Sequence, residues 1–464
     1  MKRYSNYEFI SARWYNQIPI HWHLIRIKDL ISQSNAGAWG DDPETDNGTI
    51  CLRVADMDFN LGVFKNKPVS VLTKRLYTEE QIEKLTLEQG DILIEKSGGG
   101  EKSPVGRSVY FDKSYPALFA NFMQRIRFKH KLIDAHFASY LLRTMYYRGA
   151  TWYYVKQTTG IQNLDLNSML AQERFPVPPR EEQEQIVRYL DWQVSKINRL
   201  IAAKRKEIER IQEHLDKSIE IMFDEIASSS NDSIPLGRHI TSIESGTSVN
   251  SIMGTADNDS IGVLSTSCVY GNNFDLSQNK RVAPSDYGRV SCPVKKNTLI
   301  ISRMNAPSLV GACGFSEKDD TRVYLPDRLW QVHFDNVLMP EYAWRYLSTK
   351  RIKSWFATIA TGTSSSMKNI TKPQLKSIQI PFPSLEKQAE TVRRIKTLCD
   401  KCNAACHVFE ESIMHLIDLR TRLISDVVTG QVDVRGIKVP DDEYINNEIT
   451  EEEFEEESEN NEEE

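Results

Sequence analysis

The sequence has no apolar run near 18 residues, the length at which a segment becomes a candidate membrane helix. Its first fifteen residues, MKRYSNYEFISARWY, also lack the apolar core of a signal peptide. Cysteine is scarce: the seven cysteines are odd in number and irregularly spaced, which favours reduced thiols over a disulfide framework. These absences predict a soluble, cytoplasmic protein with no membrane partner. At 464 residues and 40% hydrophobic content, the chain is long enough for two globular cores and extended helices.

Catalytic motifs are also missing. The sequence contains no His-Glu-x-x-His, no Asn/Asp-Pro-Pro-Tyr/Phe and no Walker lysine. The glycine-rich stretch Ser97–Ser103 fails as a phosphate-binding loop of the Walker type, because Glu101 precedes Lys102 and Lys96 stands where the first glycine is required. We therefore expect no catalytic residue and no cofactor bound by this chain, and a role in recognition and organisation.

Three of the cysteines cluster near the C-terminus as Cys399-x-x-Cys402-x-x-x-Cys406-His407. Thiolates and imidazole suit zinc, and a redox switch is a further alternative. All three cysteines, however, fall on the apolar positions of a helical pattern, where cysteine behaves as a small buried hydrophobe. We therefore predict core packing and no metal site.

Charge is unevenly distributed along the chain. Residues 441–464 hold fourteen acidic residues and no basic one, which predicts a disordered tail. Without these fourteen, residues 1–440 carry 58 basic and 50 acidic side chains. Their net charge is therefore +8, although that of the whole chain is −6. A body of this charge is compatible with a nucleic-acid partner, and the tail is either a solubilising terminus or a phosphate mimic that suppresses non-specific binding to DNA.

The chain repeats itself. Residues 175–183 read FPVPPREEQ and residues 380–388 read IPFPSLEKQ, and the offset from Pro178 to Pro383 is 205 residues. A period this long indicates two domain-sized copies, since solenoid repeats run to roughly 20 to 50 residues. The sequence therefore predicts a tandem duplication.

Each repeated motif runs into a heptad pattern, and adding 205 to the first pattern gives the register of the second. The predicted seam residues are Leu190, Val194, Ile197, Ile201, Ile208, Ile211 and Leu215 in the first copy, and Ile395, Cys399, Cys402, Cys406, Phe409, Ile413, Leu416 and Leu423 in the second. Lys204, Ser218 and Arg420 interrupt these seams. Each helix therefore needs a partner, and the other copy is the most economical one, which predicts a two-helix coiled coil within the chain.

Helix-end signals agree with two long helices at 179–226 and 384–430. Pro179 suits a first helical position, Ser384 is an acceptable N-cap, and Gly430 is a natural C-terminal stop. Each helix is expected to be about 42 residues, or roughly 60 Å, long. In sequence alone the two helices could run in either direction.

The segments before the helices, 1–178 and 227–383, read as similar mixed α/β modules. Strand patterns occur at 49–54 and 90–94 in the first and at 261–265 and 297–301 in the second; helical patterns occur at 136–143 and 341–347. The order of elements repeats while the residues diverge. This indicates one scaffold with two different surfaces.

The sequence resembles the specificity subunit of type I restriction–modification systems over nearly its full length. The resemblance rests on the motifs WYNQIPIHW at 14–22, GDILI at 90–94, GIQNLD at 160–165, EQEQI at 182–186, INRLI at 197–201 and LISDVVTGQVDV at 423–434. The second copy departs from the family's pattern at 364–369, and the acidic tail lies outside it.

The resemblance implies two target-recognition domains (1–178 and 227–383), each reading one half of a bipartite, asymmetric site on double-stranded DNA. It also implies that the two spacer helices pair antiparallel with pseudo-twofold symmetry. The family's partners are two methyltransferase subunits, which use S-adenosylmethionine to methylate adenine, and two motor-nuclease subunits, which use ATP and Mg²⁺. A DNA enzyme of another kind and a coiled-coil scaffold unrelated to DNA are the alternatives.

Basic groups on phosphates and polar groups on base edges are the expected means of reading DNA. The candidate DNA-binding residues are Lys96, Ser97, Arg107, Lys156, Gln157 and Thr158 in the first copy, and Arg303, Asn305, Thr363, Ser364 and Lys368 in the second. The glycine-rich loop is either a structural turn or a polar loop that approaches DNA. Helices of this length can hold two reading surfaces about one turn of DNA apart, ~34 to 36 Å.

Overall fold

The computed structural model describes residues 2–43, 47–100, 103–157, 161–230, 233–252, 254–257, 260–362 and 367–440. The acidic tail predicted at 441–464 lies outside these residues. The chain forms two compact units: the first contains the residues up to Ala203 and those from Glu411 on, and the second contains Lys204–Glu410.

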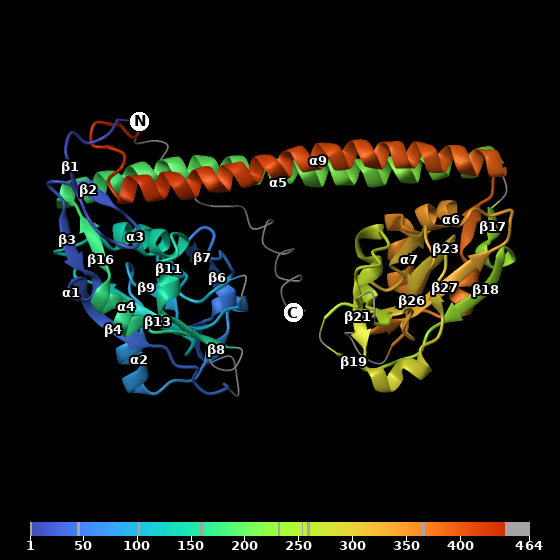
Figure 1. Ribbon diagram of the computed structural model, residues 1–464, viewed down its shortest axis with the longest axis horizontal. Coiled ribbons are helices and arrows are strands. Elements are labelled where there is room, and N and C mark those ends of the chain that lie inside the picture. The colour runs from blue at the N-terminus through green and yellow to red at the C-terminus, as the bar shows by residue number, and fades with distance from the viewer. Residues whose placement is uncertain are drawn as a thin grey trace. The chain divides into compact units, whose positions relative to one another are not determined.

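A four-stranded antiparallel sheet is the centre of the first unit (Figure 1), and its strand order is β11-β9-β13-β4. Its strands are β4 (Ile31–Ala36), β9 (Ile92–Glu95), β11 (Ser108–Tyr110) and β13 (Met123–Phe128). A second sheet, β12-β5-β8, consists of β5 (Thr49–Leu52), β8 (Lys74–Arg75) and β12 (Ala117–Phe119). A third, β10-β15-β14, consists of β10 (Ser97–Gly98), β14 (Val155–Gln157) and β15 (Gln162–Leu164).

The remaining elements of the first unit frame these sheets. The strand pairs are β1 (Tyr7–Phe9) with β2 (Gln17–Pro19), β3 (His23–Arg26) with β16 (Arg174–Val177), and β6 (Met57–Asp58) with β7 (Val63–Phe64). The helices are α1 (Ile27–Leu30), α2 (Glu79–Leu85), α3 (Ala135–Tyr147), α4 (Leu166–Gln172) and the start of α5 (Arg180–Ser230). The strands predicted at 49–54 and 90–94 and the helix at 136–143 are confirmed.

The second unit repeats the central sheet with the same connectivity. Its order is β25-β23-β27-β18, formed by β18 (Ile240–Ser245), β23 (Thr298–Ser302), β25 (Cys313–Ser316) and β27 (Leu329–Phe334). In both sheets the third strand along the chain lies at one edge and the first lies at the other. This shared order confirms the duplication in tertiary structure.

The other sheets of the second unit correspond in part to those of the first. The sheet β19-β21-β20-β26-β22 is formed by β19 (Ser251–Ile252), β20 (Gly262–Leu264), β21 (Asn279–Val282), β22 (Pro293–Val294) and β26 (Asp320–Tyr324). The pairs are β17 (Ser233–Pro235) with β29 (Gln379–Pro381) and β24 (Met304–Asn305) with β28 (Lys368–Asn369). The helices are α6 (Pro340–Leu347), α7 (Lys350–Ile359), α8 (Lys372–Ser377) and α9 (Leu385–Val428). Here too the predicted strands and helix are confirmed.

In each copy the repeated motif connects the start of the long helix to the globular module before it. Gln183 is 1% exposed; its Oε1 accepts a hydrogen bond from the Asp134 amide at 2.6 Å, and its Nε2 donates to the Pro178 carbonyl at 2.9 Å. Gln388, 205 residues later, accepts from the Met339 amide at 2.9 Å and donates to the Pro383 carbonyl at 3.0 Å. The two glutamines are retained in the motif because each satisfies buried main-chain groups at the joint.

Helix α5 has 51 residues and extends beyond the predicted end at 226, whereas α9 has 44 residues and lies within the predicted bounds 384–430. Helix α5 ends at Ser230, and Phe223 and Ile226 near this end are buried in the core of the second unit. Helix α5 begins at Arg180, one residue later than predicted, and the Pro179 carbonyl accepts from the amides of Glu182 and Gln183 at 3.0 Å.

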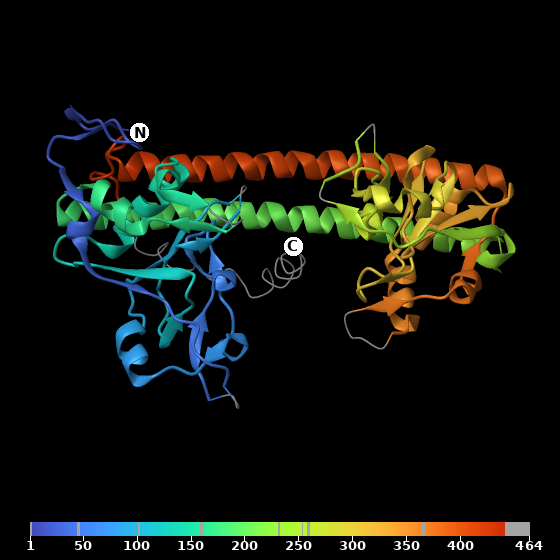
Figure 2. The same cartoon turned by 60° about the horizontal axis from the view of Figure 1, so that its bottom comes forward.

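Helices α5 and α9 lie side by side (Figures 1 and 2) and run antiparallel. In the second unit the Lys204 ammonium lies 5.3 Å from the centroid of the Phe409 ring, whereas Ile211, further along α5, lies beside Cys402, earlier on α9. Every predicted seam residue is buried or half-buried. Two of the polar interruptions have partners in the seam: Lys204 on Phe409, and Arg420, which donates to Asn198 Oδ1 at 2.5 Å within the first unit.

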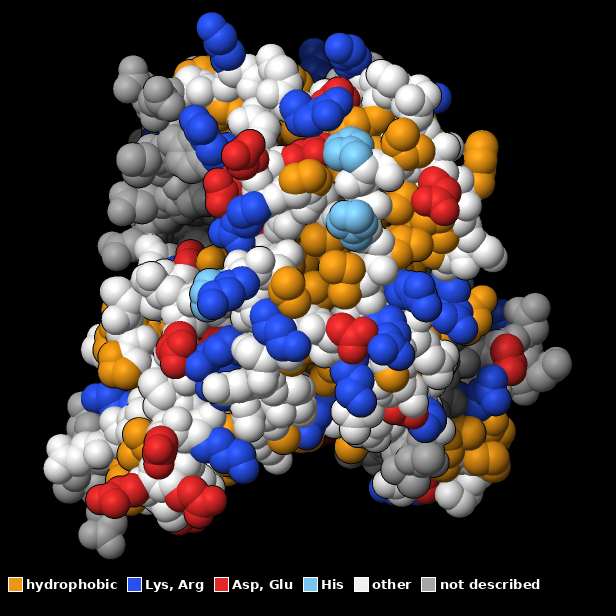
Figure 3. All heavy atoms as spheres, turned by 90° about the vertical axis from the view of Figure 1, so that its left-hand side faces the viewer, with side chains coloured by type: hydrophobic (Ala, Val, Ile, Leu, Met, Phe, Trp, Pro, Cys, Tyr) orange, Lys and Arg blue, Asp and Glu red, His pale blue; other side chains and the backbone are white. Residues whose placement is uncertain are grey.

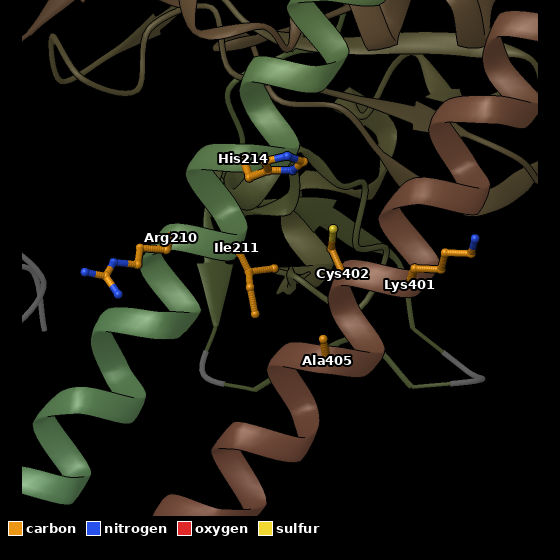
Figure 4. A pocket seen from close by; sticks show the side chains of 6 residues that line it. All are labelled: Arg210, Ile211, His214, Lys401, Cys402 and Ala405. Atoms are coloured by element: carbon orange, nitrogen blue, oxygen red, sulfur yellow. The ribbon is translucent and has the colours of Figure 1, made fainter.

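The cysteine cluster lies along this seam. Figure 4 shows Ile211 and Cys402 pointing into the space between the helices, while Arg210 and Lys401 point away from it. Cys399, Cys402 and Cys406 are half-buried, and burial raises the pKa of each thiol. Among the described residues, no group of three or more His, Cys, Asp or Glu side chains is placed to hold a metal.

Candidate DNA interface

The small sheet β10-β15-β14 brings together four of the candidate residues of the first copy. The register pairs Ser97 with Asn163, and Asn163 with Lys156, so these three residues lie in one row across the sheet. The Ser97 hydroxyl donates to Asn163 Oδ1 at 2.8 Å. Gln157 lies in the next row and is exposed, and Lys96 immediately precedes β10. A polar row of this kind offers donors and acceptors to a partner.

The glycine-rich loop follows β10 and has a conformation that only glycine adopts without strain. Gly98 and Gly99 have φ of +114° and +59°, and a Cβ on Gly99 would lie 2.9 Å from the Ser103 carbonyl oxygen. Because both glycines are required by the turn itself, the structural-turn alternative accounts for them. Glu101 and Lys102 lie outside the described residues.

Lys156 is well exposed, and its ammonium is held in an ion pair. Its ammonium donates to Asp165 Oδ2 at 2.7 Å, and this bond lowers the pKa of the Asp165 carboxyl. Asp165 in turn caps α4 by accepting from the Ser168 amide. The lysine is therefore oriented by a helix cap while its side chain stays 70% exposed, which suits a contact with a phosphate.

Arg107 has a different environment from the one expected. Its Nε and Nη2 donate to the two carboxylate oxygens of the buried Glu95 at 2.8 and 2.9 Å, and its guanidinium lies over the Phe59 ring at 4.0 Å. The charge of Arg107 is thus balanced within the protein, and its side chain is 23% exposed. Its contacts hold β9, β11 and the β6–β7 hairpin together.

The second unit places its candidates on the equivalent pair β24–β28. Lys368 pairs with Asn305, and Arg303 immediately precedes β24 and donates to the Asp327 carbonyl at 2.6 Å. Asn305 is 9% exposed, and its amide is used by Tyr270, Ser302 and the Ala306 main chain, which makes it a buried positioning residue in this structure. Thr158, Thr363 and Ser364 lie outside the described residues.

Asn163 and its counterpart Asn369 were missed as candidates. Both stand on the last small strand before a capped helix: Asp165 caps α4 and Thr371 caps α8. The register places Asn163 opposite Ser97 and Asn369 opposite Met304. A repeated Asn-(Leu/Ile)-(Asp/Thr) at 163–165 and 369–371 was the available signal, but its offset is 206 residues, because α8 is one residue shorter than α4.

On the face shown in Figure 3, basic side chains are dispersed among acidic and apolar ones instead of forming one continuous patch. This distribution agrees with the modest charge of residues 1–440. No helix of the described residues combines the length and the apolar character needed to span a bilayer.

Residues 19–210 and 264–407 match the family model described as "Type I restriction modification DNA specificity domain", which together is more than half of the chain. The chain belongs to this family. The match extends through the first module into α5 and from the second module into α9, so the family and the fold class expected from the sequence are confirmed.

Two curated relatives are specificity subunits of type I restriction enzymes. The MjaVIII subunit of Methanocaldococcus jannaschii is 26% identical over 209 residues, covering 44% of this chain and 46% of that subunit. The EcoKI subunit of Escherichia coli is 23% identical over 351 residues, covering 73% of each. The chain thus spans about half of the first relative and about three quarters of the second.

A solved chain from work on the complex assembly and conformational transition of a type I restriction–modification system has the same fold. The TM-score is 0.54 at 15% identity, over 89% of this chain and 99% of that one. At this identity the likeness shows a shared fold alone.

Proposed function

We propose that this specificity protein is the DNA-reading subunit of a type I restriction–modification complex, and that each of its two units reads one half of a bipartite site. The observation that carries the proposal is the pair of equivalent small sheets, which present different residues from the same scaffold. In the first unit the row is Ser97, Asn163 and Lys156; in the second, Met304 stands opposite Asn369. A shared scaffold with divergent side chains suits two different half-sites.

The partners follow from membership of the family. The proposed complex contains two methyltransferase subunits that bind S-adenosylmethionine and two motor-nuclease subunits that bind ATP and Mg²⁺, and the chain itself is non-catalytic and cytoplasmic. Helices α5 and α9 carry apolar side chains that are more than half exposed and are candidates for contact with such subunits: Leu200 and Met414 in the first unit and Val408 in the second.

Mapping of methylated adenines in the host genome by single-molecule sequencing tests the proposal. One bipartite motif is expected, and it should disappear when the gene for this chain is deleted. Persistence of the motif would contradict the assignment.

Two matched variants test whether each unit reads a different half of the DNA site. Asn163→Ala should relax one half of the motif and Asn369→Ala the other, because each side chain belongs to a different small sheet. A loss of the same half in both variants would contradict the proposal that each unit reads its own half-site.

A further inference from the structure

A polar cavity of about 420 Å³ in the first unit has no part in the recognition row described above. It lies between the β6–β7 hairpin, the start of β11 and the C-terminal half of α3, which are neighbours in Figure 1. Asn60, Lys65, Ser103, Arg107, Ser108 and Arg143 are among the residues that line it. Ser103 closes the glycine-rich loop that begins at β10, so the cavity adjoins the candidate DNA interface.

Arg143 is the unusual member of this lining. It is 6% exposed, yet the structure places no carboxylate of a described residue in an ion pair with it. Its Nη2 donates to the Asn60 carbonyl at 2.9 Å, and its guanidinium lies 5.9 Å from the centroid of the Tyr140 ring. The buried Nε has no hydrogen-bond partner among the described residues. A buried guanidinium normally requires an anion, because desolvation of an unpaired charge is costly.

The Arg143 guanidinium occupies space that is free because residue 62 is a glycine. Gly62 has φ of +78°, and a Cβ at this position would lie 2.6 Å from Arg143 Cζ. Any side chain at position 62 would therefore displace the arginine. The β6–β7 turn, through Gly62, therefore packs directly against the Arg143 guanidinium of α3. No carboxylate of the described residues neutralises the charge of this guanidinium.

A second buried polar group in the lining lacks a partner. Ser108 is 3% exposed, and its Oγ makes no hydrogen bond to the described residues. Among the described residues of the lining there is one acidic side chain, Asp58, whose Oδ1 accepts from the Leu61 amide at 2.9 Å. Because Arg107 is balanced by Glu95, the charges of Arg143 and Lys65 outweigh that of Asp58. The cavity therefore offers cationic and hydroxyl donors, which suit an oxyanion.

The equivalent place in the second unit lacks this chemistry. The main-chain bonds from Gly106 to Glu95 and from Gly311 to Ser302 align the two sheets, so that Ala312 and Cys313 occupy the places of Arg107 and Ser108. The 205-residue offset that relates the starts of α3 and α6 places Ser348 where Arg143 stands, and Cys313 Sγ lies 3.6 Å from Ser348 Oγ. The shared scaffold therefore does not require a buried arginine here, and Arg143 is a feature of the first unit.

We propose that this cavity binds a phosphate group, presented either by the backbone of bound DNA or by a free phosphate. Arg143, Lys65 and Ser108 are the groups that would hold it. A phosphate accepts several donors at once and supplies the negative charge that Arg143 lacks. The DNA source rests on the function proposed above, whereas the free-phosphate source does not.

The first arm of the test measures the melting temperature of the first unit in the purified full-length chain, in inorganic phosphate and in acetate at equal ionic strength. Phosphate should raise the melting temperature of the wild type by several degrees in a saturable manner, since it binds the folded state alone. Arg143→Ser, which copies the second unit, should lose this rise. Arg26→Ser is the matched control, because Arg26 is exposed and paired with Asp29 on the same unit.

The second arm measures duplex binding against salt concentration. A backbone phosphate in the cavity predicts that Arg143→Ser lowers the slope of log K against log salt by about 0.9, equally for all sequences. An unchanged slope with a lost phosphate-induced rise assigns the cavity to free phosphate. If Arg143→Ser does not fold, Lys65→Ser, at a half-buried position, should change both readouts in the same direction.

Retention of both the phosphate-induced rise and the salt slope in the variants would overturn the proposal, as would an equal rise in acetate. If the wild-type chain binds no duplex at any salt concentration, the proposed DNA-reading function fails, and the thermal arm still decides whether the cavity takes phosphate.

Discussion

The repeated glutamines predict a matched pair of local destabilisations. In Gln183→Met the side chain keeps its length and loses both polar atoms. The Asp134 amide and the Pro178 carbonyl are then left without their partner. An unsatisfied buried polar group costs about 1–3 kcal/mol, so the two together cost about 2–4 kcal/mol, with the part-buried amide at the lower end. Gln388→Met should cost at least as much, because it strips the Met339 amide and the Pro383 and Val337 carbonyls.

Native-state hydrogen exchange can assign each loss to its unit. At tenfold for every 1.4 kcal/mol, amides in the first unit of Gln183→Met should exchange roughly 30- to 700-fold faster, and those of the second unit should be unchanged. Gln388→Met should show the converse. Gln193→Met is the control on the same helix, since its half-buried side chain makes no hydrogen bond to the described residues. A change below about 0.5 kcal/mol in either motif variant would refute the reasoning, because it is the size of an ordinary surface substitution.

Two further predictions concern the C-terminal segment of the first unit. Gly430→Ala should destabilise that unit by at least about 1–2 kcal/mol in urea titrations, because φ is +72° and the new Cβ would lie 2.4 Å from Pro19 Cδ. Gly436→Ala, where no atom lies within 4 Å of the added Cβ, is its control, and equal stability of the two would argue against the close approach. The hydrogen bond from Arg435 lowers the pKa of the Asp433 carboxyl below its unfolded value of about 3.9, so the stability it contributes is present above that pH and is lost as pH falls through the folded pKa. Asp433→Asn should therefore reduce the loss of unfolding free energy that acid causes below about pH 4. If the pH dependence of the unfolding free energy in this range is unaltered, the ion pair does not contribute as argued.

Much of the fold was predictable because its signals are local. The heptad register, the N-cap Ser384 and the stop at Gly430 act over a few residues, and the structure confirms both long helices with their ends within about four residues. The strands at 49–54, 90–94, 261–265 and 297–301 were likewise visible as short apolar runs. The end of α5 was placed too early, and its last turns join a core that includes Tyr342 and Tyr346, whose rings contact that of Phe223.

The candidate interface was predicted only in part. Lys96, Ser97, Lys156 and Gln157 were chosen as polar residues beside strands; the last three lie on one small sheet, Lys96 immediately precedes it, and their contact with DNA stays a prediction. Asn163 was missed, since its place opposite Ser97 depends on a pairing across 66 residues. Arg107 carries the right charge for DNA, but its ion pair with Glu95 could not be recognised before the turn between β9 and β11 was known.

The amino-acid sequence by itself determined the duplication, the helix register, the order of elements and, through its motifs, the family. The tertiary structure decided the antiparallel direction of α5 and α9, the strand order shared by the two central sheets, and the burial of Arg143 in a cavity of the first unit alone. The physical reason is the sequence separation over which each kind of interaction acts. Periodicity and capping are set by neighbours a few residues apart, whereas direction, strand order and the environment of a charge depend on which distant segments the folded chain brings into contact.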